Sequence, residues 1–274
     1  MAQGQWMSLR RGANGDGVRI LQKALATRGF DPGDVDGQFG PATEAAVLAL
    51  QRSDGLLADG LAGPRTATAL GLADSNELPS SIPDVTVEIV SRMFPEAPIV
   101  HIRAHLPPLL AALEQRAVSD RSMVLVALAA VRAESDAFLP TSEATSRFNT
   151  SPSGRLFDLY DNRKDLGNLG PPDGATFVGR GFVQLRGRAA YRRYGPRLRI
   201  PCDLERHPAL ACATEVAADL LALFLADREI EIRRALLNGF LREARQLANG
   251  GSDGMERFAD AFETGDRLLD DRDI

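Results

Sequence analysis

An eight-residue pattern occurs twice in the first quarter of the chain. Residues 36–43 read DGQFGPAT and residues 59–66 read DGLAGPRT, so both copies share D-G-x-x-G-P-x-T. An Asp-Gly pair favours a tight turn because glycine accepts positive φ angles, and proline fits the first position of a helix. Each copy therefore predicts a turn and a helix start. The simpler interpretation is that both copies are only helix-start signals. The repetition of all five fixed positions makes that interpretation incomplete.

Three short helices are predicted around this repeat. Apolar residues recur at helical spacing over 18–25, and Gly29 closes that helix. A second helix is expected over 41–51, and a third begins near Pro64. Residues 1–72 are therefore predicted to form one small three-helix unit.

Length and composition agree with two modest domains. The chain has 274 residues, of which 44% are hydrophobic and 25% are charged, so it can build a core without disulfides. Residues 73–86 are rich in Ser and Pro and lack a helical period, which predicts a linker. We therefore predict domains at 1–72 and 87–274.

The second domain is predicted to be mainly helical, which makes the whole chain mainly α. Residues 122–132 are apolar nearly all round, which is typical of a buried helix. Further helices are predicted over 215–227 and 229–248, the second with a glycine stop. Residues 140–190 are rich in Gly, Pro, Asn and Ser, and a long irregular stretch inside a compact domain is usually functional.

Charge and hydropathy exclude several classes of partner. The net charge is −5 and the basic residues are scattered, whereas a nucleic-acid binder carries a basic stripe. The longest aliphatic stretch, 123–131, is far shorter than the roughly 20 residues of a membrane span. Cys202 and Cys212 favour two reduced thiols, with a single disulfide as the alternative. We predict no metal or cofactor and expect a monomer.

Two glutamates lie in contrasting sequence environments. Glu134 follows the apolar stretch, where partial desolvation favours a protonated carboxyl and suits a general acid. Glu143 lies in a hydroxyl-rich, loop-like segment and should stay ionised. Cleavage of a glycosidic bond uses one carboxyl to donate a proton and another to activate water. The chain has 37 acidic residues, so their spacing alone makes the pair a weak candidate.

Four segments of the second domain carry a more specific signal. They are ALAAVRAES with Glu134, TSE with Glu143, DLYDNRKDLGN followed by FVGRGFVQL, and NGG followed by Arg257. In this order, residues 121–257 resemble the family 19 glycoside hydrolases, which are chitinases and endolysins with a lysozyme-like helical fold. The G-R-G-x-x-Q-L run is the most specific part of the match.

This resemblance implies an inverting mechanism and a set of site residues. Glu134 would protonate the glycosidic oxygen and Glu143 would deprotonate a water, with the two carboxyls ~6.5–9.5 Å apart. Gln184 and Asn249 would bind sugar amide or hydroxyl groups. Arg180 and Arg257 would hold the cleft and its carboxylates, with structural ion pairing as the equally weighted alternative. The predicted substrate-binding set is completed by Tyr160, Ser142 and Arg186.

Two positions depart from the family pattern. Arg186 stands where the family has a hydroxyl that positions the attacking water, and Ala190 stands where it commonly has Asn. An arginine is a permanent cation without an acceptor. In the cleft it would favour the charged form of a nearby glutamate or contact an acidic substrate group. Water positioning would then fall to Ser142, Ser146 or Asn149.

The N-terminal unit resembles a three-helix peptidoglycan-binding module. The matching residues are GVRILQ at 17–22, VDGQFG at 35–40, Thr43, Ala46-Val47, Gln51 and the second Asp-Gly turn. The implied role is to hold the enzyme on its polymer and so raise the local substrate concentration.

Together these resemblances predict an endolysin-like cell-wall hydrolase, a glycoside hydrolase acting on β-1,4 bonds of peptidoglycan. A chitinase and a binding-only protein with a decayed site are the alternatives. The expected partner is peptidoglycan or a chitin-like glycan. Residues 1–11 lack the pattern of a signal peptide, so we expect synthesis in the cytoplasm and action on the cell wall after phage lysis or dedicated export.

Overall fold

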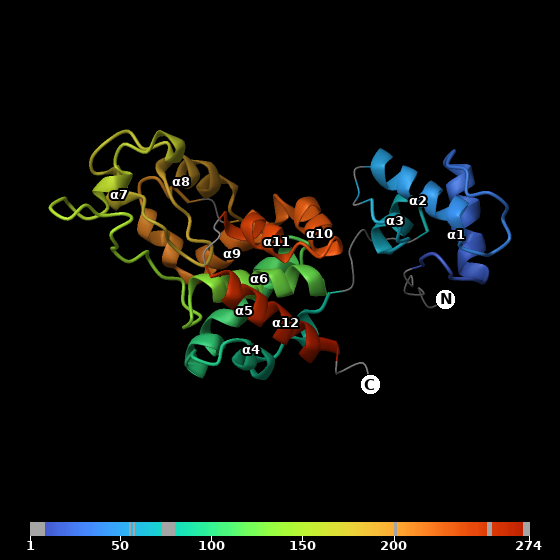
Figure 1. Cartoon of the computed structure of the whole chain (residues 1–274), viewed down its shortest axis with the longest axis horizontal. Helices are drawn as coiled ribbons and strands as arrows, with labels where there is room; N and C mark the ends of the chain where they lie inside the picture. Colours follow the sequence, from blue (N-terminus) through green and yellow to red (C-terminus); the bar gives the residue numbers. More distant parts are fainter. Residues whose placement is uncertain are drawn as a thin grey trace. The chain divides into compact units, whose positions relative to one another are not determined.

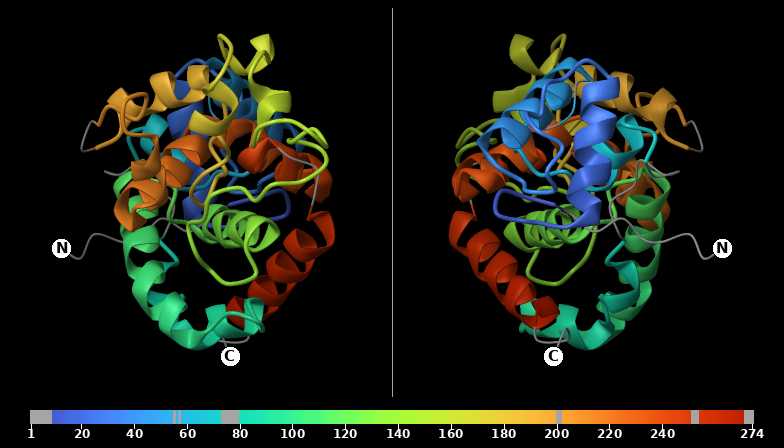
Figure 2. Two further views of the ribbon diagram at one scale, coloured as in Figure 1. Left: turned by 90° about the vertical axis from the view of Figure 1, so that its left-hand side faces the viewer. Right: turned by 90° about the vertical axis from the view of Figure 1, so that its right-hand side faces the viewer.

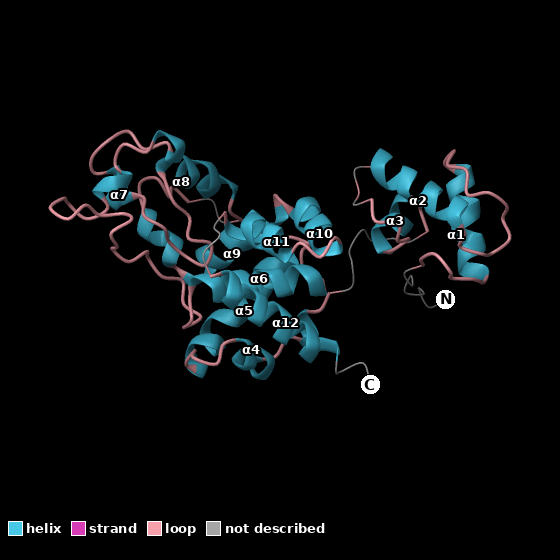
Figure 3. Ribbon diagram, viewed as in Figure 1, coloured by secondary structure: helices cyan, strands magenta, loops and turns pink. Residues whose placement is uncertain are grey.

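The computed structural model describes residues 9–54, 56, 58–72, 80–199, 202–250 and 254–270 (Figure 1). The chain divides into two compact units, Met1–Ser80 with Arg233–Gly239, and Ser81–Ile232 with Phe240–Ile274. The predicted mainly α class is confirmed, and in the described ranges extended structure is limited to isolated bridges (Figure 3).

The α-helices are α1 (Asp16–Thr27), α2 (Pro41–Ser53), α3 (Pro64–Ala69), α4 (Val87–Met93), α5 (Ile99–Gln115), α6 (Arg121–Glu134), α7 (Asp173–Thr176), α8 (Arg188–Tyr194), α9 (Thr214–Ala226), α10 (Glu229–Leu237), α11 (Leu241–Asn249) and α12 (Met255–Asp270). Short 3-10 turns cover Ile82–Asp84, Asp158–Tyr160, Lys164–Leu166, Gly195–Arg197 and Pro208–Cys212.

The three helices predicted for the N-terminal unit are confirmed. Both repeat prolines occupy the first position of their helices, α2 and α3. Gly29, just beyond α1, has a φ of +83°, which only glycine adopts at low cost. The core of this unit consists of Val18, Leu21, Leu25, Phe39, Ala46, Val47, Leu50 and Ala62.

A buried glutamine explains the first copy of the repeat. Nε2 of Gln22 donates to Oδ1 of Asp36 (3.0 Å), the carbonyl of Gln38 (3.1 Å) and the hydroxyl of Thr43 (3.2 Å). Oε1 of Gln22 accepts from the backbone N–H of Gly37 (2.9 Å). One amide therefore ties α1 to the Asp-Gly turn and to the start of α2. The same amide, with the Gln38 N–H, lowers the pKa of Asp36 from its usual value.

The second copy repeats this network atom for atom. Nε2 of Gln51 donates to Oδ1 of Asp59 (2.8 Å), the carbonyl of Leu61 (2.9 Å) and the hydroxyl of Thr66 (3.2 Å). Its Oε1 accepts from the N–H of Gly60 (3.0 Å). The repeat is therefore more than a helix-start signal, because its Asp, Gly and Thr positions all bond to one buried glutamine.

Helix α6 is central to the second unit. Its residues from Met123 to Ala133 are all buried, which confirms the predicted buried helix. The segment lacks Gly and Pro and is rich in Ala and Leu, which favour helix. It packs against α9, α11 and α12 (Figure 2). The predicted acid, Glu134, is the last residue of this buried element.

The prediction of one helix over 229–248 is wrong, because α10 and α11 are separate. Asn238-Gly239 interrupts the run, and Gly239 has a φ of +72°, which continues no right-handed helix. The predicted helix over 215–227 is confirmed as α9. The glycine stop after α11 is also present, since Gly250 has a φ of +77°.

The predicted domain boundaries stay a prediction. Residues 73–79 of the predicted linker lie outside the described residues. At its other end, the N–H of Ser81 donates to the carbonyl of Ser119 (2.9 Å), and Val85 is buried.

The described residues also bear on the predictions about membrane spans and cysteines. Within them, no helix has both the length and the apolar character needed to cross a bilayer. Cys202 and Cys212 are free thiols, and burial raises the pKa of Cys202.

We expect Gln22→Leu to destabilise the N-terminal unit by about 2–3 kcal/mol, because it leaves buried polar groups of the turn without their partner. Amide hydrogen exchange of α1 and α2 in the full chain measures this loss. Lys23→Gln, an exposed neighbour on the same helix, is the matched control. Unchanged exchange in Gln22→Leu would show that the network is dispensable.

Candidate active site

The stretch between α6 and α8 carries Glu143 and its surroundings and is mainly loop (Figure 3). Isolated bridges pair Arg180 with Ser142 and with Leu185. The N–H of Glu143 donates to the carbonyl of Gly179 (2.7 Å). These backbone contacts place the segment that carries Glu143 against the G-R-G-x-x-Q-L run.

Glu134 projects from the C-terminal end of α6, with its side chain 24% exposed. Its Oε1 accepts from Nη2 of Arg245 (2.8 Å) and from Nδ2 of Asn249 (2.6 Å), both on α11. The Arg245 side chain is 1% exposed, so this contact is nearly buried on the arginine side. Among the described residues, every donor to Glu134 binds Oε1, which leaves Oε2 for another group.

Glu143 lies in a different setting, with its side chain 15% exposed. Its Oε1 accepts from the Tyr160 hydroxyl (2.8 Å) and from Nδ2 of Asn149 (3.2 Å), and it forms an ion pair with Nη2 of Arg186 at 3.0 Å. Its Oε2 accepts from Nε of Arg186 (3.1 Å) and from the N–H of Gly179 (3.1 Å). A carboxylate offers about four lone-pair sites, so these four hydrogen bonds saturate it.

Arg186 and Tyr160 bind Glu143 together. The Arg186 guanidinium lies over the Tyr160 ring, 5.0 Å from its centroid. Burial raises the pKa of the Tyr160 hydroxyl, and its bond to Glu143 raises it further. Gly179 leaves room beside them, because a Cβ there would lie 2.8 Å from Oε1 of Gln184 and 3.1 Å from Oε2 of Glu143, and both side chains would have to shift.

A pocket of about 510 Å³ brings several predicted residues together. Glu134, Gln184, Arg186 and Asn249 all line it. Ala190, one of the two departures from the family pattern, lines it as well. Its other lining residues are Asp165, Leu166, Val183, Leu185, Ala189, Arg193, Tyr194, Phe224, Arg228, Arg245 and Gly250.

Two predicted arginines instead have structural contacts. Nη1 of Arg180 donates to the carbonyl of Thr176 (2.8 Å) and to the Tyr191 hydroxyl (3.0 Å). Arg257, on α12, donates to Asp136 (3.2 Å) and to the carbonyl of Ala133 (2.6 Å). Neither lines the pocket. Arg257 forms the kind of ion pair that the structural alternative describes, whereas the carbonyl and the hydroxyl that Arg180 binds are neutral. Their roles in the cleft stay predictions.

Ser142 belongs to the segment that carries Glu143, and Gln184 binds the same segment. The Ser142 hydroxyl is exposed and contacts Sγ of Cys212 at 3.5 Å. Gln184 has a φ of +50°, an uncommon value for a residue other than glycine. Its Nε2 donates to the carbonyls of Thr141 and Gly181, both at 3.0 Å. The side-chain amide thus joins this pocket residue to the loop before Glu143.

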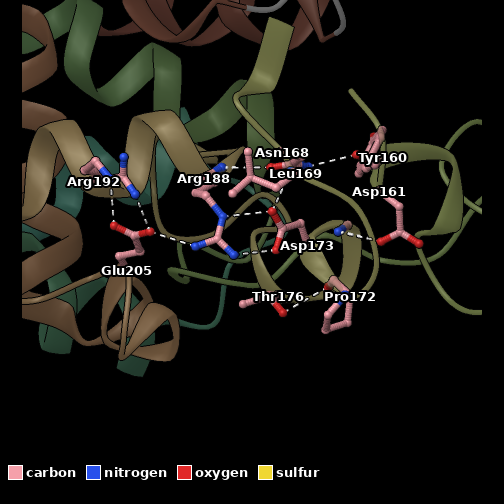
Figure 4. Close-up of polar contacts among 11 residues, drawn as sticks. Tyr160, Asp161, Asn168, Leu169, Pro172, Asp173, Thr176, Arg188, Arg192 and Glu205 are labelled. Carbon is pink, nitrogen blue, oxygen red and sulfur yellow. Dashed lines mark hydrogen bonds and ion pairs between the residues drawn. The ribbon is translucent and has the colours of Figure 1, made fainter. Parts of the chain in front are cut away.

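A polar network binds the main chain of Tyr160 through Asn168 (Figure 4). Nδ2 of Asn168 donates to the carbonyl of Tyr160 (2.8 Å), and its Oδ1 accepts from the N–H of Arg188 (2.9 Å). The Arg188 guanidinium then binds both oxygens of Asp173 (2.8 and 2.6 Å) and one of Glu205 (2.7 Å). These contacts fix the loop that carries Tyr160 to the start of α8.

Sequence reasoning missed Arg245 and Asn168 as site-building residues. Arg245 lies four positions before Asn249 on α11, so the two share one helix face. That spacing is the signal that could have revealed a second partner for Glu134. Asn168 was part of a recognised motif, but its bridging role depends on contacts distant in the chain.

Comparison with known proteins supports the N-terminal prediction. Residues 14–70 match the family described as "Putative peptidoglycan binding domain". The resemblance of the first unit to a peptidoglycan-binding module is therefore confirmed, whereas that of the second unit to family 19 glycoside hydrolases stays a prediction.

Curated relatives match over short lengths. A zinc D-Ala-D-Ala carboxypeptidase of Streptomyces albus G is 50% identical over 64 residues, 22% of this chain and 24% of that protein. The N-acetylmuramoyl-L-alanine amidase CwlM of Mycobacterium tuberculosis is 48% identical over 56 residues, which are 20% of this chain and 14% of that protein. A spore cortex-lytic enzyme of Bacillus cereus is 45% identical over 62 residues, which are 23% of this chain and 24% of that protein. The chain therefore spans a quarter or less of these relatives.

One solved structure aligns over nearly the full length. The crystal structure of Burkholderia AP3 phage endolysin covers 97% of this chain and 99% of its own, at 20% identity and a TM-score of 0.26. A TM-score this low establishes no shared fold.

We expect the second unit to lose stability as the pH falls from about 4.5 to about 2. Hydrogen bonds from Arg192 and Arg188 lower the pKa of Glu205 from 4.5 to about 2. A carboxylate with a depressed pKa stabilises the folded state above its unfolded pKa, and that contribution is lost as pH falls through the folded pKa. Melting temperatures of wild type and Glu205→Gln should therefore converge near pH 2.

Glu263→Gln, an exposed change on α12, is the matched control for this titration. It should keep the full acid dependence of the wild type. A Glu205→Gln variant whose melting temperature falls as steeply as that of the wild type between pH 4.5 and 2 would contradict the prediction.

Proposed function

We propose that this protein is a cell-wall hydrolase that cleaves a β-1,4 glycosidic bond of peptidoglycan, with Glu134 as the proton donor. The proposal is supported by the peptidoglycan-binding family match of residues 14–70 and by a pocket of about 510 Å³ that Glu134 lines. The resemblance of the second unit to family 19 glycoside hydrolases supports the choice of a glycosidic bond.

The observation that carries the proposal is the one-sided coordination of Glu134. Arg245 and Asn249 bind only its Oε1. In the reactive state a proton on Oε2 passes to the glycosidic oxygen as the bond to the leaving sugar breaks. The carboxylate that forms is then stabilised by Arg245 and Asn249, which are already in place and need no reorganisation.

Glu143 is the proposed base, and Arg186 controls it. A base must accept a proton from water, and the four hydrogen bonds to Glu143 leave no lone pair for one. In this mechanism Arg186 moves away when substrate binds, and Glu143 then accepts the proton of the attacking water. Tyr160 and Asn149 keep the carboxylate oriented during that step.

A binding-only protein is the second candidate, and the saturation of Glu143 by hydrogen bonds favours it. A permanently saturated Glu143 activates no water, so the second unit would bind glycan without cleaving it. Pelleting with sacculi without release of product is the result that would distinguish this function.

We expect Glu134→Gln to reduce hydrolysis of purified sacculi by about 10²–10⁴-fold, because an amide cannot donate the proton. Reducing ends and mass spectrometry of the products measure both rate and bond. Glu263→Gln serves as the acidic surface control. Full activity in Glu134→Gln would remove Glu134 from the mechanism, and wild-type products cut between lactyl group and peptide would indicate an amidase.

We expect Arg186→Ser to raise kcat on sacculi by about tenfold, because it removes the ion pair and one of the four hydrogen bonds that bind Glu143, and supplies a hydroxyl. Arg206→Ser is the matched control, since the Arg206 side chain is 83% exposed and pairs with the exposed Asp203. Steady-state kinetics of the full chain measure the change. A lower kcat in Arg186→Ser would mean that Arg186 supports catalysis directly.

A further inference from the structure

The pocket that Glu134 lines carries an excess of positive charge. Its charged lining residues are Arg186, Arg193, Arg228, Arg245, Glu134 and Asp165. Arg245 is paired with Glu134 and Arg186 with Glu143. Asp165 is bound by Arg163 through both of its oxygens, at 2.7 and 2.5 Å. The remaining cations are Arg193 and Arg228, which lie at the ends of α8 and α9.

At this end of the pocket three guanidinium groups lie near a single carboxylate, that of Asp227. Asp227 has an 18% exposed side chain, and Arg197 binds its two oxygens at 2.5 and 2.7 Å. Arg193 approaches Asp227 only to 3.9 Å and has a 64% exposed side chain. The bond from Arg197, and then the charges of Arg197, Arg193 and Arg228, lower the pKa of Asp227. The carboxylate is therefore already ionised and neutralises only one of the three cations.

Arg228 is oriented by neutral partners. Its guanidinium lies 3.7 Å from the centroid of the Phe224 ring. Its Nη1 donates to the Tyr194 hydroxyl (3.3 Å) and to the carbonyl of Phe224 (3.2 Å). These contacts hold the group without supplying an anion, and the described residues place no carboxylate within ion-pair distance of it. A guanidinium with Nε and Nη2 donors still available matches the planar geometry of a carboxylate.

We propose that Arg193 and Arg228 form a subsite for a carboxylate group of the substrate. The inference rests on the proposed function for the polymer class, because it assigns a substrate group to the same pocket. Chitin carries no carboxylate, whereas peptidoglycan carries them on its peptide stems and, where the peptide is removed, on the lactyl group. Tyr194 and Phe224 line the pocket beside the two arginines and supply apolar surface for the atoms next to that carboxylate.

Binding of short ligands tests this subsite without turnover. The full chain in a Glu134→Gln background is titrated by calorimetry with three disaccharides of equal length. These are a GlcNAc–MurNAc disaccharide with a peptide stem, the same disaccharide without peptide, and the chitin disaccharide. We expect the Kd of at least one carboxylate-bearing ligand to be about tenfold below that of chitin disaccharide, one charge-assisted contact in energy.

The two muropeptide arms identify the source of the carboxylate. Tighter binding of only the ligand with peptide assigns the subsite to the stem, and tighter binding of only the peptide-free ligand assigns it to the lactyl group. Arg193→Gln and Arg228→Gln, singly and together, should remove the preference over chitin disaccharide and its dependence on salt. Arg206→Gln is the matched surface control and should keep the preference.

Equal binding of all three ligands, or an equal loss for all three in the arginine variants, would overturn the subsite. Arg193 is exposed, so Arg193→Gln gives a readout even where Arg228→Gln lowers the melting temperature. Failure of the proposed glycosidase function is a separate result, since it appears in the products formed by the wild type and leaves the binding titration interpretable.

Discussion

The nearly complete burial of one arginine constrains the architecture of the second unit. Arg245 is 1% exposed, and a buried cation is tolerated only where it is paired and hydrogen-bonded. Glu134 supplies that pairing from the end of α6, so the ion pair joins α6 to α11. The same contact occupies Oε1 of Glu134, and no donor among the described residues binds Oε2. In the proposed mechanism this structural ion pair also stabilises the carboxylate that forms when Glu134 donates its proton.

The two glutamates differ in the number of hydrogen bonds that they accept. Glu134 accepts two on one oxygen, whereas Glu143 accepts four over both oxygens. Burial alone does not account for the difference, since the two side chains are 24% and 15% exposed. Arg186 supplies one of the four hydrogen bonds and an ion pair to Glu143, so the residue that departs from the pattern of the resembled family also alters the candidate base.

The sequence predicted the features that depend on local pattern. Helices α1, α2 and α6 follow from apolar periodicity and proline position, and the repeat indicated a turn before each helix. The network under the repeat was not predictable in the same way, because Gln22 precedes its Asp-Gly pair by 14 residues and Gln51 precedes its own by 8. One helix was predicted where α10 and α11 lie, because apolar periodicity continues across Gly239. The partners of Arg180, Arg186 and Arg257 required tertiary contacts that no spacing encodes.

Two residues that line the pocket lie outside the buried helix α6. Arg186 belongs to the loop segment between α6 and α8, and Ala190 is on α8. Neither belongs to the buried set of α6. Substitutions at these two positions alter the charge and shape of the pocket while the apolar residues of α6 keep their packing. The lining of the pocket can therefore vary independently of the helix that carries Glu134.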